Sequence, residues 1–143
     1  MDINTLTATL AAAIANVSCI DHVYVSVDLE NRPGEDECPY AIIYPTSKNV
    51  GQTQAQKVHG FEVIICVSDY NSSTVGKITT YDVVETLETT RKVVETAIVA
   101  AMPDNTIINF EIEYETLEQF PLALAGMSLQ ITESTVIGGD YLL

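Results

Sequence analysis

Apolar residues recur along the chain with two different periods. Over residues 3–17 they fall every three or four positions in an alanine-rich segment without glycine or proline, which predicts an amphipathic helix with Asp2 placed to cap it. The same spacing predicts a long second helix over about 77–102, ended by Pro103. The buried stripe predicted for that helix is Ile78, Tyr81, Val84, Leu87, Val94, Ile98 and Ala101.

Elsewhere apolar and polar residues alternate, as they do in half-buried strands. This pattern predicts strands over 23–29, 40–44, 61–67, 107–118 and 122–133. The strand over 61–67 is apolar on one face and partly apolar on the other, so we expect it to lie in the middle of a sheet.

Polar segments separate these elements. Residues 30–39 predict a loop with two prolines, 46–60 predict a long polar loop or extended arm, and 69–74 predict a turn. The resulting order is α-β-β-β-α-β-β, which predicts an α+β fold with a mostly antiparallel sheet and two helices packed on one face. We expect a single domain over 1–135, followed by a flexible tail over 136–143.

The stretch I107-I-N-F-E-I-E-Y-E-T-L-E118 puts a row of carboxylates on one face of a strand. Glu111, Glu113 and Glu115 point one way and the apolar residues between them point the other. Such a row could be a general acid–base pair or a magnesium site. Catalytic carboxylates, however, usually reach a pocket from different elements and have unequal surroundings, so a solvated outer face fits the regular row better.

Composition narrows the classes of partner. The chain has 143 residues, is 47% hydrophobic and carries a net charge of −14 spread along its length. A chain of this size can bury a real core, but its charge would repel nucleic acid phosphates and anionic membranes. No apolar run approaches the ~20 residues of a membrane-spanning helix. Three cysteines without close spacing indicate reduced thiols rather than a disulfide framework.

The sequence offers little for catalysis. Cys19 and His22 form a ligand-like pair that Cys38 and His59 could complete, but the second pair is too widely spaced for a typical zinc site. Phosphate-binding and dinucleotide-binding glycine loops are absent, as is a serine nucleophile motif, although a Cys–His pair stays open. We therefore predict a protein that is not an enzyme and needs no metal or cofactor.

Several segments suit an assembly protein. The two long polar loops and the apolar end Tyr141-Leu142-Leu143 are appendages that a self-contained monomer does not need. They could reach a neighbouring subunit, or they could be solvated surface segments.

The chain resembles the tail terminator (tail completion) proteins of long-tailed bacteriophages. The resemblance covers about residues 3–135. It is carried by the N-terminal helix, by P39-Y-A-I-I-Y-P45 and a long connection into H59-G-F-E-V-I-I-C-V67, by the helix V83-V-E-T-L-E-T-T-R-K-V-V94, and by the last two strands.

This resemblance implies a protein made in the host cytoplasm that forms a ring, typically a hexamer, at the head-proximal end of the tail tube in the virion. Such a ring caps the tube, stops its polymerisation and meets the head–tail connector, while DNA passes through its hole. Glu111, Glu113 and Glu115 could then face the DNA channel, a neighbour's Lys48 and Lys57, or only water. The alternatives are another neck or head–tail joining protein, a tail-tube relative, or a small enzyme or binding module.

Overall fold

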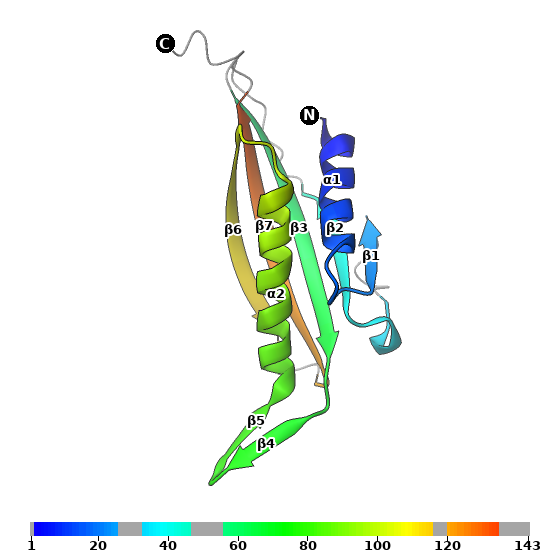
Figure 1. The fold of residues 1–143 in the computed structure, drawn as a ribbon, viewed down its shortest axis with the longest axis vertical. Helices are drawn as coiled ribbons and strands as arrows, with labels where there is room; N and C mark the ends of the chain where they lie inside the picture. Colours follow the sequence, from blue (N-terminus) through cyan, green and yellow to red (C-terminus); the bar gives the residue numbers. More distant parts are fainter. Residues whose placement is uncertain (1, 26–32, 47–55, 116–119, 135–143) are drawn as a thin grey trace.

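The computed structural model describes residues 2–25, 33–46, 56–115 and 120–134 (Figure 1). Lys48 and the predicted docking residues Tyr141, Leu142 and Leu143 lie outside these ranges. The described elements are α1 (Ile3–Ala15), β1 (His22–Val25), the short 3₁₀ helix η2 (Glu35–Glu37), β2 (Tyr40–Pro45), β3 (Gln56–Ser68), β4 (Ser72–Val75), β5 (Ile78–Tyr81), α2 (Asp82–Ala101), β6 (Thr106–Glu115) and β7 (Leu122–Ser134).

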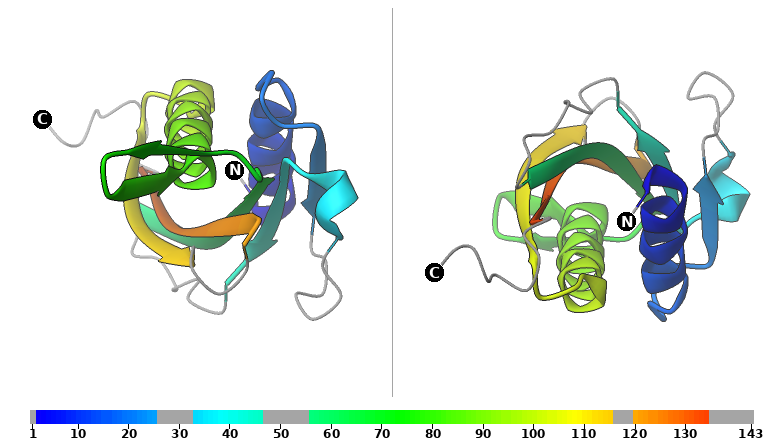
Figure 2. Two further views of the ribbon diagram at one scale, coloured as in Figure 1. Left: turned by 90° about the horizontal axis from the view of Figure 1, so that it is seen from below. Right: turned by 90° about the horizontal axis from the view of Figure 1, so that it is seen from above.

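Five of the strands form one sheet in the order β1-β2-β3-β7-β6. Every neighbouring pair is antiparallel except β1 and β2, which run parallel. Both helices lie on the same side of this sheet (Figure 2). The predicted α+β class is therefore confirmed, and β3 is central as its two apolar faces indicate.

The main core fills the space between the sheet and the helices. α1 begins at the expected place, where the Asp2 carboxylate accepts a hydrogen bond from the Thr5 N–H at 2.7 Å. Side chains from one face of β3 and β7 meet the apolar stripes of the two helices. The largest fully buried side chains in this cluster are Phe61, Leu6, Leu10, Ile14, Ile43, Ile65, Leu87, Ile98, Met127 and Ile131.

A smaller apolar cluster lies on the other face of the sheet. Tyr40, Ile42, Cys66 and Leu124 are buried there. Two hydrogen bonds hold the segment around η2 beside this cluster. Tyr40 donates one to the Pro33 carbonyl at 3.2 Å, and Ser68 donates the other to the Glu35 carboxylate at 2.8 Å. Consequently this face of the sheet has an apolar part near η2 and a polar part beyond it.

The start predicted for the second helix is wrong. Residues 72–81 form the β4–β5 hairpin, and α2 begins only at Asp82. Consequently Ile78 and Tyr81 are exposed rather than buried. Within α2, Val84 and Ala101 are exposed as well. The stripe that is buried on α2 consists of Val83, Leu87, Thr90, Arg91, Val94 and Ile98.

Within α2 the predicted residues Leu87, Val94 and Ile98 are buried, whereas the stripe begins at Val83 rather than Val84. Val83 and Val84 are adjacent, and either could begin a stripe that continues through Leu87 and Val94. Packing selects Val83, which is 1% exposed, over Val84, which is 49% exposed.

The polar segment over 46–60, predicted as a long loop or an extended arm, is extended in its last residues. β3 begins at Gln56, so 56–60 are strand residues that pair with β7. The polar side chains of this segment do not indicate a strand, but its backbone groups form hydrogen bonds with the adjacent strand β7. Lys57 is within this strand, opposite Glu133 in the register.

Candidate assembly surface

The face of the sheet that the helices leave uncovered carries the row of glutamates. Glu111 and Glu113 are exposed on β6, and their apolar neighbours Phe110 and Ile112 pack against the core on the other side. β6 is the last strand of the sheet order, so within the described residues its outer edge pairs with no strand. The row therefore stands on a sheet edge, where charged side chains oppose unwanted strand pairing between molecules.

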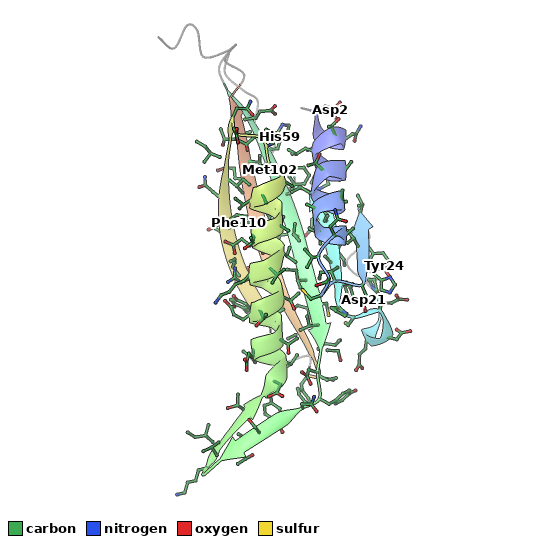
Figure 3. All side chains as sticks on the ribbon, in the orientation of Figure 1. Asp2, Asp21, Tyr24, His59, Met102 and Phe110 are labelled. Carbon is green, nitrogen blue, oxygen red and sulfur yellow. The ribbon has the colours of Figure 1, made fainter. Side chains whose placement is uncertain are left out.

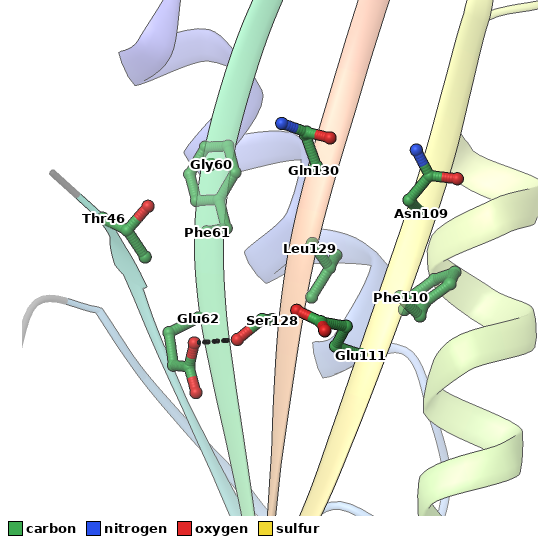
Figure 4. A pocket seen from close by; sticks show the side chains of 10 residues that line it. All are labelled: Thr46, Gly60, Phe61, Glu62, Asn109, Phe110, Glu111, Ser128, Leu129 and Gln130. Atoms are coloured by element: carbon green, nitrogen blue, oxygen red, sulfur yellow. Dashed lines mark hydrogen bonds between the residues drawn. The ribbon is translucent and has the colours of Figure 1, made fainter. Parts of the chain in front are cut away.

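A groove lies beside this row, on the same face (Figure 4). It crosses β7 at Ser128, and its two sides include Glu62 on β3 and Glu111 on β6. Glu62 accepts a hydrogen bond from Ser128 at 2.7 Å, and a Cβ atom at Gly126 would lie 3.2 Å from the Glu62 carboxylate. The groove has a volume of about 360 Å³, and its two carboxylates give it negative charge.

The second feature is the β4–β5 hairpin, which we call the arm and define as residues 72–81. The arm projects from one end of the molecule, past the ends of the sheet and of α2 (Figure 1). All ten of its residues are exposed, including Val75 at 79% and Ile78 at 70% next to its turn. Large apolar side chains in such a position gain nothing from the fold of the isolated chain.

The arm is nevertheless well supported. Thr74 and Thr79 share a hydrogen bond across the hairpin at 2.9 Å, and Gly76 has φ 62° in the two-residue turn. Positive φ at the first central position suits glycine and the hairpin turns that match strand twist. At the base, Phe120 packs edge-on against Tyr70 and Tyr81, with ring centroids 6.0 and 5.0 Å apart.

The sequence of the arm itself indicates a hairpin rather than the start of a helix. The segment S72-S-T-V-G-K-I-T-T-Y81 is rich in β-branched residues on both sides of a Gly-Lys pair. Two such runs separated by two residues, the first of them glycine, are typical of a tight hairpin.

The candidate catalytic residues do not come together. His22 Nε2 lies 3.0 Å from a Glu37 oxygen near η2, whereas His59 is buried near the end of the sheet far from the arm (Figure 3). Cys38 lies beside Cys66, with sulfurs 3.6 Å apart, and burial raises the pKa of the Cys38 thiol to about 12. A thiol held protonated in this way is a poor nucleophile.

The described residues contain no group of three or more His, Cys, Asp or Glu side chains arranged to hold a metal ion. Within the same part of the chain, neither helix combines the length and apolar character needed to cross a membrane.

The sequence matches no protein-family model and no curated protein. Among solved structures, it is similar to a chain described as "Virion of native gene transfer agent (GTA) particle". The two share 13% sequence identity with a TM-score of 0.45, over 87% of this chain and 84% of that chain. A similarity of this size does not assign a function.

Proposed function

We propose that this chain is a virion structural protein, a ring-forming tail terminator that caps the tail tube, stops its polymerisation and joins the tail to the head–tail connector. The observation that carries the proposal is the arm. It is an ordered hairpin that holds two large apolar side chains in water, Val75 and Ile78. An element of this kind suits a protein that binds a neighbour.

The arrangement of the two surfaces supports a ring. The arm projects from one end of the molecule and the acidic groove is on the uncovered face of the sheet (Figures 1 and 4). Contact between two different surfaces of identical subunits is head-to-tail, and such contacts close into a ring when the rotation permits. The resemblance to tail terminators supports a hexamer.

The charge of the chain suits a DNA channel. A lumen lined with basic residues would hold DNA through its phosphates, whereas a lumen lined with carboxylates lets it slide. Glu113 is exposed on the edge strand and is one candidate for such a lining, together with Glu115, whose side chain lies outside the described part. Lys48 and Lys57 stay candidates for contacts across the ring.

An enzyme is the less favoured alternative. Glu62 and Glu111 come from different strands, as catalytic carboxylates often do, but β7 runs between them. Their backbones are two strand spacings apart, about 10 Å. The groove they flank contains no histidine, cysteine, lysine or arginine among the residues that line it.

The proposal is tested by assembling tails with and without this protein. If it ends tube growth, tails made without it should have tubes of uncontrolled length, and a labelled copy should appear at the head-proximal tip in electron microscopy. Tubes of normal length that merely fail to join heads would favour a neck adaptor instead. A chain that remains monomeric at high concentration in a sizing column would refute the ring.

A further inference from the structure

We infer that the arm of one subunit docks in the acidic groove of the next copy, with Lys77 placed between Glu62 and Glu111 of that neighbour. This inference rests on the proposed ring and names the two surfaces that build it. The partner is therefore a second copy of this chain.

Charge complementarity supports this pairing. The arm carries one charged residue, Lys77, which is exposed at its turn. The other described basic side chains serve the subunit itself, because Arg91 and Lys92 lie 2.7 and 3.8 Å from the Glu88 carboxylate on α2. The arm is thus a positive projection on a chain of net charge −14, and subunits with that charge repel each other except where such a projection meets an acidic surface.

Shape supports it as well. The turn of the arm consists of Gly76 and Lys77, so its end is narrow and carries one long side chain. Between the two glutamates the groove is lined by the small side chain of Ser128, where a larger side chain would close it. Val75 and Ile78 lie opposite each other just behind the turn, and docking would remove their exposed apolar surface from water.

Glu62 is already held in place within the free subunit. Its carboxylate is fixed by Ser128 above the space that Gly126 leaves free, so the acceptor for a lysine is ordered before a neighbour arrives. Ordering a group in advance reduces the entropy lost on binding.

Charge reversal tests the inference. Lys77→Glu and Glu111→Lys should each raise the concentration at which rings form by about tenfold or more, since each puts like charges together across the interface. The double variant should recover most of the wild-type assembly. The matched controls are Lys92→Glu and Asp104→Lys, which reverse exposed charges outside both surfaces and should leave ring formation unchanged. The measurement is mass by light scattering on a sizing column, with circular dichroism to show that each variant is folded.

A third variant changes shape without changing charge. Ser128→Leu fills the groove from an exposed position and should block assembly. Rings that persist unchanged in both Lys77→Glu and Ser128→Leu would overturn the inference while leaving the proposed ring intact. Failure of the double reversal to recover assembly would also overturn it. A wild-type chain that never assembles would overturn both proposals.

Discussion

Arg91 Nη2 lies 2.7 Å from Glu88 Oε1 on α2, and the other oxygen of Glu88 accepts a hydrogen bond from Tyr114 on β6. One carboxylate thus joins a nearly buried guanidinium to the edge strand. Arg91 also pairs with Glu95, so its charge is matched within a single helix face. The network fixes α2 against β6, the strand that carries the exposed glutamates.

Removal of the guanidinium should therefore destabilise the chain. Arg91→Met keeps the length and helix propensity of the side chain and should reduce the free energy of unfolding by about 1–2 kcal/mol, because it removes hydrogen bonds to charged groups. Lys92→Met is the control, since Lys92 is exposed and its loose pair with Glu88 should contribute less than about 0.5 kcal/mol. Urea unfolding measures both. Equal values for the two variants would mean that the Arg91 network does not stabilise the fold.

The same network predicts a dependence on pH. Hydrogen bonds from Arg91 and then Tyr114 lower the pKa of Glu88 from 4.5 to about 2. Since the folded-state pKa is depressed, the stabilisation from Glu88 is fully present above pH 4.5 and is lost as the pH falls towards about 2. The difference in free energy of unfolding between wild type and Glu88→Gln should be constant near neutral pH and should shrink over that acidic range. A difference that does not change with pH would contradict the assigned pKa.

Two neighbouring positions on α2 should respond very differently to truncation. Leu87 is fully buried, so Leu87→Ala should lower the free energy of unfolding by about 2–5 kcal/mol through lost burial and a residual cavity. Val84 is 49% exposed, and Val84→Ala should change it by less than about 0.5 kcal/mol. A large loss of unfolding free energy for Val84→Ala would mean that Val84 is buried, as the sequence pattern predicts. It would contradict the orientation of α2 in the structure.

The edge glutamates should protect against aggregation. In the double variant Glu111→Val with Glu113→Val, the unpaired edge of β6 becomes apolar, and we expect irreversible association seen as rising light scattering. The control is Gln130→Val with Thr132→Val, which adds apolar surface to the same face on β7, a strand already paired on both sides. If both variants aggregate alike, the exposed apolar area matters and the edge does not.

The turn of the arm should depend on glycine. Gly76 has φ 62°, a conformation that costs a residue with a side chain about 1–2 kcal/mol, although no atom lies within 4 Å of an added Cβ. Because the arm contributes little to the core, Gly76→Ala should leave the melting temperature of the subunit nearly unchanged. Its effect should appear as faster amide hydrogen exchange in 72–81. A clear fall in melting temperature would show that the arm supports the fold itself.

The sequence by itself determined the α+β class, the central place of β3 and the outward direction of Glu111 and Glu113. These features depend on local periodicity, because a strand alternates its faces and a helix repeats every 3.6 residues wherever the chain folds. The cap at Asp2 is equally local, since it needs only the first turn of α1.

Only the tertiary structure decided the phase of α2, the extension of β3 back to Gln56 and the position of β6 at a sheet edge. Val83 and Val84 are equally apolar, and contact with the sheet selects between them. Strand order depends on pairing between distant segments, as in the register of Gly126 with Ile64 on one side and Glu113 on the other. That pairing brings Glu62 and Glu111, 49 positions apart in the sequence, to the two sides of one groove.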